Sequence, residues 1–171
     1  VGLKNDAADK KSENGSWGYL MAAQGYNGKD AYNSGWYDPQ GDKIQYLIPM
    51  EAGEYAVTFG FHDWWYADFA ERPMNLKAYV GETTVDFGAC GSKSDPKEFT
   101  AVKELKLDAA ADVILSVEKG TKSAPILNWI SIQKKSGTDR GALKAQMNRA
   151  GVLNAADYSA ESYANLAAAA K

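Results

Sequence analysis

The chain has 171 residues, of which 45% are hydrophobic and 12% aromatic, so it can build a hydrophobic core of moderate size. Its formal net charge of −3 and pI near 5.2 argue against nucleic acid or an anionic membrane surface as a partner, because both need a basic face. One Cys and one His exclude an intramolecular disulfide and any Cys-cluster or multi-His metal site. No apolar run approaches the ~18 residues of a membrane span.

The first 42 residues carry weak strand signals. Residues 1–16 are dominated by Lys, Asp, Asn and Glu, and we expect them to form a flexible N-terminal segment. Residues 17–23 predict a first strand. The stretch 24–42 combines Gly, Asn, Asp and Pro with several aromatic rings, which is typical of a loop.

Seven further strands are predicted from alternating apolar residues. They are expected near residues 44–48, 55–61, 74–80, 83–87, 99–107, 113–117 and 126–132. About eight short strands with no helix between them predict an all-β fold, an antiparallel β-sandwich over residues 17–135, rather than a parallel α/β sheet.

The pattern changes after residue 135. Apolar residues at helical spacing predict a short C-terminal α-helical appendage, a pair of helices within residues 139–171. The first helix is marked by Leu143, Met147 and Ala150, and the second by Tyr163, Leu166 and Ala170. The sequence therefore predicts a module boundary near residues 135–139.

The connection between the strands at 55–61 and 74–80 is unusually aromatic. It carries Trp64, Trp65 and Tyr66 in succession, where turn residues are usual. Rings beside hydrogen-bonding groups suit a sugar, whose C–H face stacks on a ring while its hydroxyls pair with polar side chains. Two interpretations stay open. Either the rings pack a long loop onto the core, or at least one is exposed and binds a ligand.

The polar residues of this loop allow similar alternatives. His62 and Asp63 are candidates for contacting sugar hydroxyls, and His62 is alternatively a packing residue. Arg72 could grip a hydroxyl or an acidic sugar, or form a salt bridge with Asp63 or Glu71 that braces the loop. Neighbouring carboxylates could in principle hydrolyse a glycoside, but charged residues are common in exposed loops, so we expect no enzyme activity.

Three motifs resemble the family 6 and family 35 carbohydrate-binding modules. The segment from Gly35-Trp36-Tyr37 through Gly41-Asp42 leads into the step Ala52-Gly53-Glu54-Tyr55, and Asn128-Trp129-Ile130 opens the last strand. The order and spacing of the motifs agree with those of these families, and the resemblance covers roughly residues 17–134. The resemblance implies a galactose-binding-like jelly roll that binds sugar at its loop rim, with Asn128 among the contacts.

Two departures from these families bear on the site. The ring-bearing loop before the last strands is replaced by residues 90–99, where Phe99 is the only ring. The stacking rings would then come from Trp64, Trp65 and Tyr66, with Trp36 and Tyr37 as further candidates. The Glu-x-Glu pair that contributes to a structural calcium is also absent, although Asp38 and Asp42 could supply oxygen ligands. No other cofactor is expected.

The tail resembles a different element. Residues 143–150 and 156–169 look like the first half of a FIVAR repeat, a helical module of bacterial cell-surface glycosidases. The two resemblances together imply a non-catalytic carbohydrate-binding module of a secreted or cell-surface glycoside hydrolase. Its partners would be a mono- or oligosaccharide and the neighbouring catalytic domain. The alternative is a spacer sandwich that supports the catalytic domain and binds no sugar.

Overall fold

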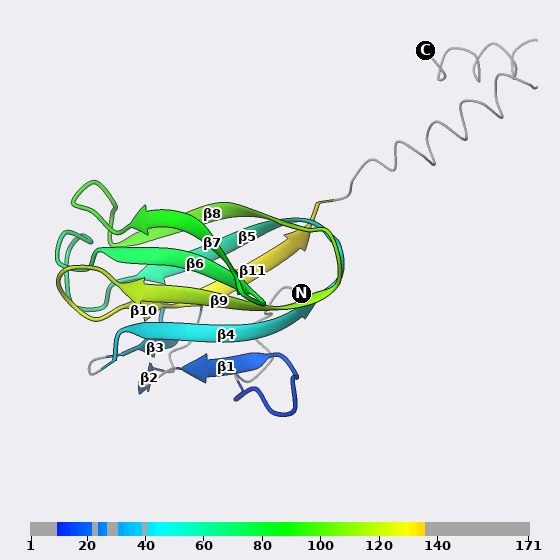
Figure 1. The fold of residues 1–171 in the computed structure, drawn as a ribbon. Helices are drawn as coiled ribbons and strands as arrows, with labels where there is room; N and C mark the ends of the chain where they lie inside the picture. The colour runs from blue at the N-terminus through cyan, green and yellow to red at the C-terminus, as the bar shows by residue number, and fades with distance from the viewer. Residues whose placement is uncertain (1–9, 22–23, 27–30, 39–40, 136–171) are drawn as a thin grey trace, which may run out of the picture. The chain divides into compact units, whose positions relative to one another are not determined.

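The computed structural model describes residues 10–21, 24–26, 31–38 and 41–135 (Figure 1). The chain divides into two compact units, residues 1–135 and 136–171. The predicted helical pair therefore lies outside the described residues, as do residues 1–9. The described residues form an all-β structure without a helix, as the sequence predicts.

The first layer of the fold is a five-stranded antiparallel sheet in the order β1-β4-β9-β6-β7. Its strands are β1 (Gly18–Met21), β4 (Lys43–Met50), β9 (Ala111–Lys119), β6 (Met74–Val80) and β7 (Thr83–Cys90). The connection from β6 to β7 is a tight turn at Gly81, whose φ of 58° suits glycine. Residues 10–12 extend this layer through backbone hydrogen bonds to Tyr19 of β1.

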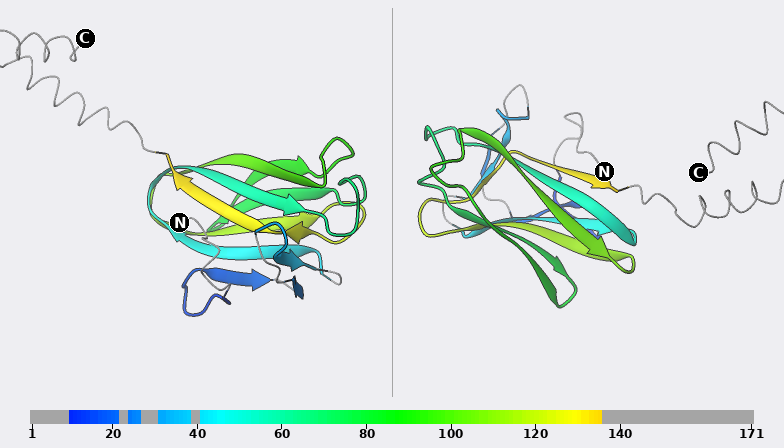
Figure 2. Two further views of the ribbon diagram at one scale, coloured as in Figure 1. Left: turned by 180° about the vertical axis from the view of Figure 1, so that it is seen from behind. Right: turned by 90° about the horizontal axis from the view of Figure 1, so that it is seen from above.

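A second layer packs against the first (Figure 2). It is a three-stranded antiparallel sheet in the order β11-β5-β8, built from β11 (Trp129–Lys134), β5 (Gly53–His62) and β8 (Glu98–Leu107). A small third sheet has the order β10-β3-β2, built from β10 (Ile126–Leu127), β3 (Gly35–Tyr37) and β2 (Gln24–Tyr26).

The core lies between the two larger sheets because alternate residues of each strand point inward. Val57, Phe59 and Phe61 of β5 are fully buried, and Leu76 of β6 and Val113 of β9 are buried in the same cluster. Burying apolar surface from both sheets in one cluster, at about 25 cal/mol per Å², is what holds the layers together. These inward positions agree with the alternation in the sequence.

Three details differ from the sequence-based expectations. The stretch 24–42, expected to be a loop, contains β2 and β3, which are only three residues long and too short for alternation to reveal. The predicted last strand is broken at Asn128 into β10 and β11. The sequence places Trp129 on the opposite face of the last strand from Asn128 and predicts that it is a core residue. In the structure it lies on the opposite face of β11 from the buried Ile130 and packs over Gly60 of β5.

Candidate functional site

Three loops meet at one end of the sandwich, and we call them the rim: residues 63–73, 91–97 and 120–125 (Figure 1). The backbone N–H of Asp63 donates to the carbonyl of Lys97 at 3.0 Å, and the N–H of Ser123 donates to the carbonyl of Glu71 at 3.0 Å. The aromatic loop 63–73 is thus fastened to both neighbouring loops. Such backbone bonds give it a defined conformation despite its length.

A buried ion pair lies inside this loop. Arg72 Nε donates to Asp63 Oδ2 at 2.6 Å, and the two side chains are only 5% and 0% exposed. A terminal nitrogen of Arg72 also donates to the carbonyl of Ala124 in the third loop. Buried charges are tolerated only when they are paired and hydrogen-bonded, and both conditions are met here. Of the two alternatives for Arg72, the structure contains the bracing salt bridge, with Asp63 as the partner.

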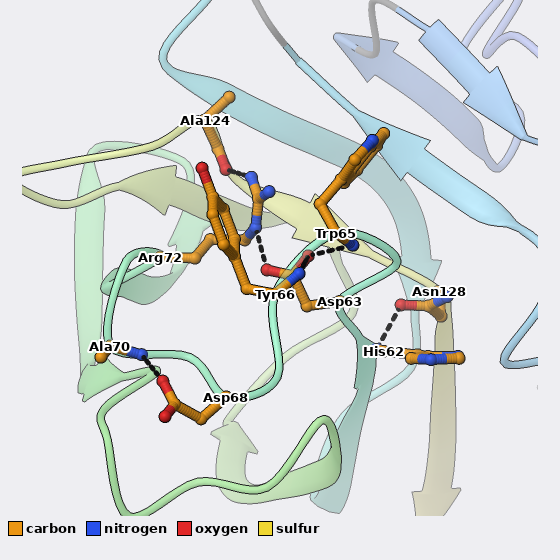
Figure 3. A network of polar contacts seen from close by, with 9 residues as sticks. All are labelled: His62, Asp63, Trp65, Tyr66, Asp68, Ala70, Arg72, Ala124 and Asn128. Carbon is orange, nitrogen blue, oxygen red and sulfur yellow. Dashed lines mark hydrogen bonds and ion pairs between the residues drawn. The ribbon is translucent and has the colours of Figure 1, made fainter.

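The same pair organises two of the predicted stacking rings (Figure 3). Asp63 Oδ1 accepts hydrogen bonds from the backbone N–H of Trp65 at 3.0 Å and of Tyr66 at 3.2 Å. The Arg72 guanidinium carbon lies 5.5 Å from the ring centroids of both Trp65 and Tyr66, within cation–π range. Backbone and side chain of both aromatic residues are therefore held by one buried pair.

Trp65 and Tyr66 are the exposed rings of the rim, at 54% and 38% relative accessibility. Tyr37 of β3 meets Trp65 in an edge contact, with ring centroids 4.8 Å apart. Phe69 is fully buried and packs against Phe99. The aromatic loop therefore combines both interpretations: Phe69 anchors it to the core, while Trp65 and Tyr66 face solvent.

Trp64 and His62 are directed to the carbonyl of Tyr32 instead. Trp64 Nε1 donates to that oxygen at 3.1 Å, and His62 Nδ1 lies 2.9 Å from it. His62 is buried, and its Nδ1 is 3.5 Å from a carboxylate oxygen of Glu98. Both residues link the segment 31–34 to the end of β5.

Asn128 belongs to the same link. Its Oδ1 accepts from the backbone N–H of His62 at 2.7 Å, while its Nδ2 donates to the carbonyls of Tyr32 at 2.9 Å and Ser34 at 3.0 Å. Trp36 points to the opposite face of β3 from its neighbour Tyr37, because adjacent strand residues alternate in direction. Its ring packs on Tyr19, with centroids 5.0 Å apart, and on Gly25.

The structure thus places the nine predicted contact residues in three groups. The exposed Trp65 and Tyr66 lie around the buried Asp63 and Arg72, and the half-buried Tyr37 contacts Trp65. His62, Trp64 and Asn128 converge on Tyr32. Trp36 packs toward β1 and β2. Sequence reasoning missed Ala124 and the carbonyl role of Tyr32, because no side-chain signal marks a backbone acceptor.

A shallow groove of about 630 Å³ lies outside the rim rings, over the outer face of the five-stranded sheet. Tyr79, Glu118 and Lys119 are among the residues that line it. Glu118 accepts from Lys77 Nζ at 2.6 Å and from the Tyr79 hydroxyl at 2.5 Å. In the β6–β9 pairing Lys77 lies opposite Ser116, and Glu118 is two residues along β9 from Ser116, on the same face of the sheet. Polar residues that alternate on both strands form a cross-strand pattern that could have marked this network.

The electrostatics of this network follow from its hydrogen bonds. The bond to Glu118 raises the pKa of Lys77 and that of Tyr79 above their usual values. Burial of Glu118 acts to raise the pKa of its carboxyl, but hydrogen bonds from Lys77, Tyr79 and Ser116 outweigh this and lower it. The fold therefore favours the charged forms of Lys77 and Glu118 and the neutral form of Tyr79.

No metal centre is evident in the part of the chain that the structure describes, where no three His, Cys, Asp or Glu side chains gather as a ligand set. Asp38, one of the two carboxylates considered for calcium, is buried, and its Oδ1 accepts from the backbone N–H of Gly41 at 2.7 Å. Among these same residues, no helix is long and apolar enough to cross a membrane.

Comparison with known proteins identifies a fold but no family. No family model matches the sequence, and no curated protein matches it. A β-glucuronidase of Bacteroides uniformis matches the structure with a TM-score of 0.52 at 14% identity, over 74% of this chain. β-Glucuronidase 2 of the same organism, bound to cyclophellitol-6-carboxylate aziridine, matches with a TM-score of 0.51 at 17% identity, over 74% of this chain.

The chain spans only 15% of the length of each of these glucuronidases. A family 35 carbohydrate-binding module of Paenibacillus barcinonensis also matches, at 16% identity. The match covers 72% of this chain and 95% of the module. Its TM-score of 0.44 is too low to establish a shared fold. At such low identities the glucuronidase matches show a shared fold alone. The chain adopts a β-sandwich that recurs within a larger glycosidase.

Proposed function

We propose that this β-sandwich is a non-catalytic carbohydrate-binding module of a larger glycoside hydrolase, secreted or attached to the cell surface. It binds a mono- or oligosaccharide at the rim. The observation that carries the proposal is the exposure of Trp65 and Tyr66, at 54% and 38%, on a loop where their backbone N–H groups are bonded to the buried Asp63. Large rings held in solvent on a rigid loop offer a stacking surface for the C–H face of a sugar.

Two further features support this proposal. The fold recurs as part of a Bacteroides β-glucuronidase, which is itself a glycosidase. The resemblance of the sequence motifs to family 6 and 35 modules points to the same class and to a galactose-binding-like jelly roll. A module of this kind acts by tethering, which makes the encounter of the catalytic domain with its polysaccharide effectively intramolecular.

The spacer function is the second candidate, and one specific observation favours it. The predicted hydroxyl contacts Asp63, Arg72 and Asn128 all have partners within the fold. A sugar at the rim would find rings but few unengaged side chains there. A sandwich that only holds a neighbouring domain needs no such groups.

Titration with a panel of neutral and acidic oligosaccharides separates the two candidates. Calorimetry or NMR should give dissociation constants from about 100 µM to a few mM, because a shallow site makes few contacts. Trp65→Ala should weaken binding at least about tenfold. Val102→Ala is the matched control, since Val102 is 61% exposed on the outer face of β8. No response of the folded protein to any sugar at ~50 mM would establish the spacer function instead.

A further inference from the structure

The role of Arg72 decides which ligands the rim can accept. A free arginine would grip a carboxylate through two parallel N–H bonds. Arg72 is the only arginine among the described residues, and it is 4% exposed. Its Nε is already bonded to Asp63 at 2.6 Å and a terminal nitrogen to Ala124. The guanidinium is thus committed to the interior of the loop.

The other charged side chains of the aromatic loop are also engaged. The Glu71 carboxylate accepts from Lys122 Nζ at 2.9 Å. The Asp68 carboxylate accepts from the backbone N–H of Ala70 at 2.8 Å. Within residues 63–73 the formal charges are three carboxylates against one arginine. On this loop an acidic ligand would therefore meet no unpaired cation. The neighbouring loop 91–97 adds the exposed Lys93 and Lys97 and the carboxylate of Asp95, and loop 120–125 adds Lys122. The rim as a whole thus carries four carboxylates and four cations and attracts neither sign of charge.

Arg72 nevertheless acts on the exposed rings. Figure 3 shows its guanidinium between the rings of Trp65 and Tyr66, whose centroids are each 5.5 Å away. Its partner Asp63 holds the backbone N–H groups of the same two residues. Trp65 and Tyr66 are thus held through both backbone and ring. They lose little conformational freedom when a ligand binds, which favours affinity.

Building on the proposed function, we infer that Arg72 is a positioning residue, which lies between Trp65 and Tyr66 and holds both rings. The rim therefore gives an acidic saccharide no advantage over a neutral one. Binding occurs by stacking on these two rings, and Arg72 makes no contact with the ligand. Affinity should consequently depend little on salt, since screening affects charge pairs rather than stacking.

The first test uses the wild-type protein with cellotetraose and xylotetraose as neutral probes and tetragalacturonate as the acidic one. We expect the neutral probes to bind at least as tightly as tetragalacturonate, with less than about a twofold change between low and high salt. Preferential binding of tetragalacturonate, weakened by salt, would overturn the inference that the rim gives acidic saccharides no advantage. This measurement does not depend on any variant folding.

The second test follows Trp65 directly, by fluorine NMR of protein labelled with 5-fluorotryptophan. Trp65→Phe assigns the signal among the five tryptophans. Arg72→Lys keeps the positive charge that neutralises Asp63 but loses the planar guanidinium. The Trp65 signal should therefore move toward its position in unfolded protein. Affinity for the neutral probes should fall about tenfold. The ratio of neutral to acidic affinity should stay the same.

Other outcomes separate the possible failures. If Arg72→Lys selectively reduces binding of one probe while the Trp65 signal is unchanged, Arg72 contacts the ligand and the inference is wrong. The double variant Asp63→Asn, Arg72→Met removes the charged pair without leaving a lone buried charge, and it should reproduce the shift of the Trp65 signal. If no probe binds wild-type protein, the proposed function fails, yet the Trp65 signal still decides whether Arg72 positions the ring.

Discussion

The side-chain amide of Asn128 holds the end of β5, because its Oδ1 accepts the backbone N–H of His62 at 2.7 Å across a sequence separation of 66 residues. The same amide donates to the carbonyls of Tyr32 and Ser34. One side chain thus joins three segments that are distant in sequence. It occupies the break between β10 and β11, which explains why a short polar residue interrupts a strand there.

Asn128→Ala should lower the free energy of unfolding by about 2–4 kcal/mol, because it removes the acceptor of the His62 N–H and one hydrogen bond each to the carbonyls of Tyr32 and Ser34. Urea denaturation measures this change. Gln133→Ala is the matched control, since Gln133 is an exposed amide on β11, and it should change stability by less than about 0.5 kcal/mol. Equal effects of the two substitutions would show that the Asn128 amide does not brace these segments.

Gly60 and Trp129 give a second prediction about stability. A Cβ placed on Gly60 would lie 2.0 Å from Cε2 of the Trp129 ring, so Gly60→Ala must displace the indole. We expect a loss of about 1–3 kcal/mol and a shift in tryptophan fluorescence.

The double variant Gly60→Ala, Trp129→Ala isolates this clash. With the indole removed, the added methyl group has space, so Gly60→Ala should cost much less in the Trp129→Ala background than in the wild type. If the double variant lost as much stability as the sum of the two single variants, the Trp129 ring would not lie against Gly60.

The sequence predicted the larger strands because their burial follows a period of two. Val57, Phe59 and Phe61 alternate with polar or small residues, and only one of the two faces can enter the core. β2 and β3 escaped prediction because three residues cannot display such a period. The glycines and aromatic rings of residues 24–42 also fit a loop as well as they fit short strands.

The rim was harder to predict than the sheets. Trp64 and Trp65 are neighbours with the same chemistry, yet Trp64 donates to the carbonyl of Tyr32 while Trp65 is 54% exposed. What separates them is the tertiary position of a backbone oxygen that leaves no trace in the sequence. The Asp63–Arg72 pair was among the alternatives considered, because opposite charges nine residues apart can meet across a loop. Its burial could not be known, since that depends on the loop 120–125.

Cys90 offers a test of burial. Cys90 is half-buried, and this desolvation raises the pKa of its thiol to about 12. The thiolate is the reactive form. Near pH 8 the folded protein should react with a disulfide reagent at least roughly 100-fold more slowly than the same protein in concentrated urea. Comparable rates in both states would mean that the end of β7 opens readily or that the thiol is accessible.

The Glu118 network gives a prediction about pH. The folded-state pKa of Glu118 is lowered, so its contribution to stability is present above the unfolded pKa near 4.5 and is lost as the pH falls through the lower folded value. The pKa of Lys77 is raised, so its contribution is present below 10.5 and is lost only as the pH rises beyond it. Between these limits the network should stabilise the fold at full strength.

Glu118→Gln should therefore destabilise the protein by about 1–2 kcal/mol near pH 7. The effect should be smaller near pH 3, which lies below the ordinary pKa of 4.5, where the contribution of the carboxylate to stability is being lost. Urea denaturation at both pH values gives the two differences. Asp108→Asn serves as the control, because the Asp108–Lys106 pair, at 3.2 Å, has side chains 90% and 69% exposed and should contribute little at either pH. A Glu118→Gln effect that is the same at both pH values would show that shape, rather than the carboxylate charge, matters at this position.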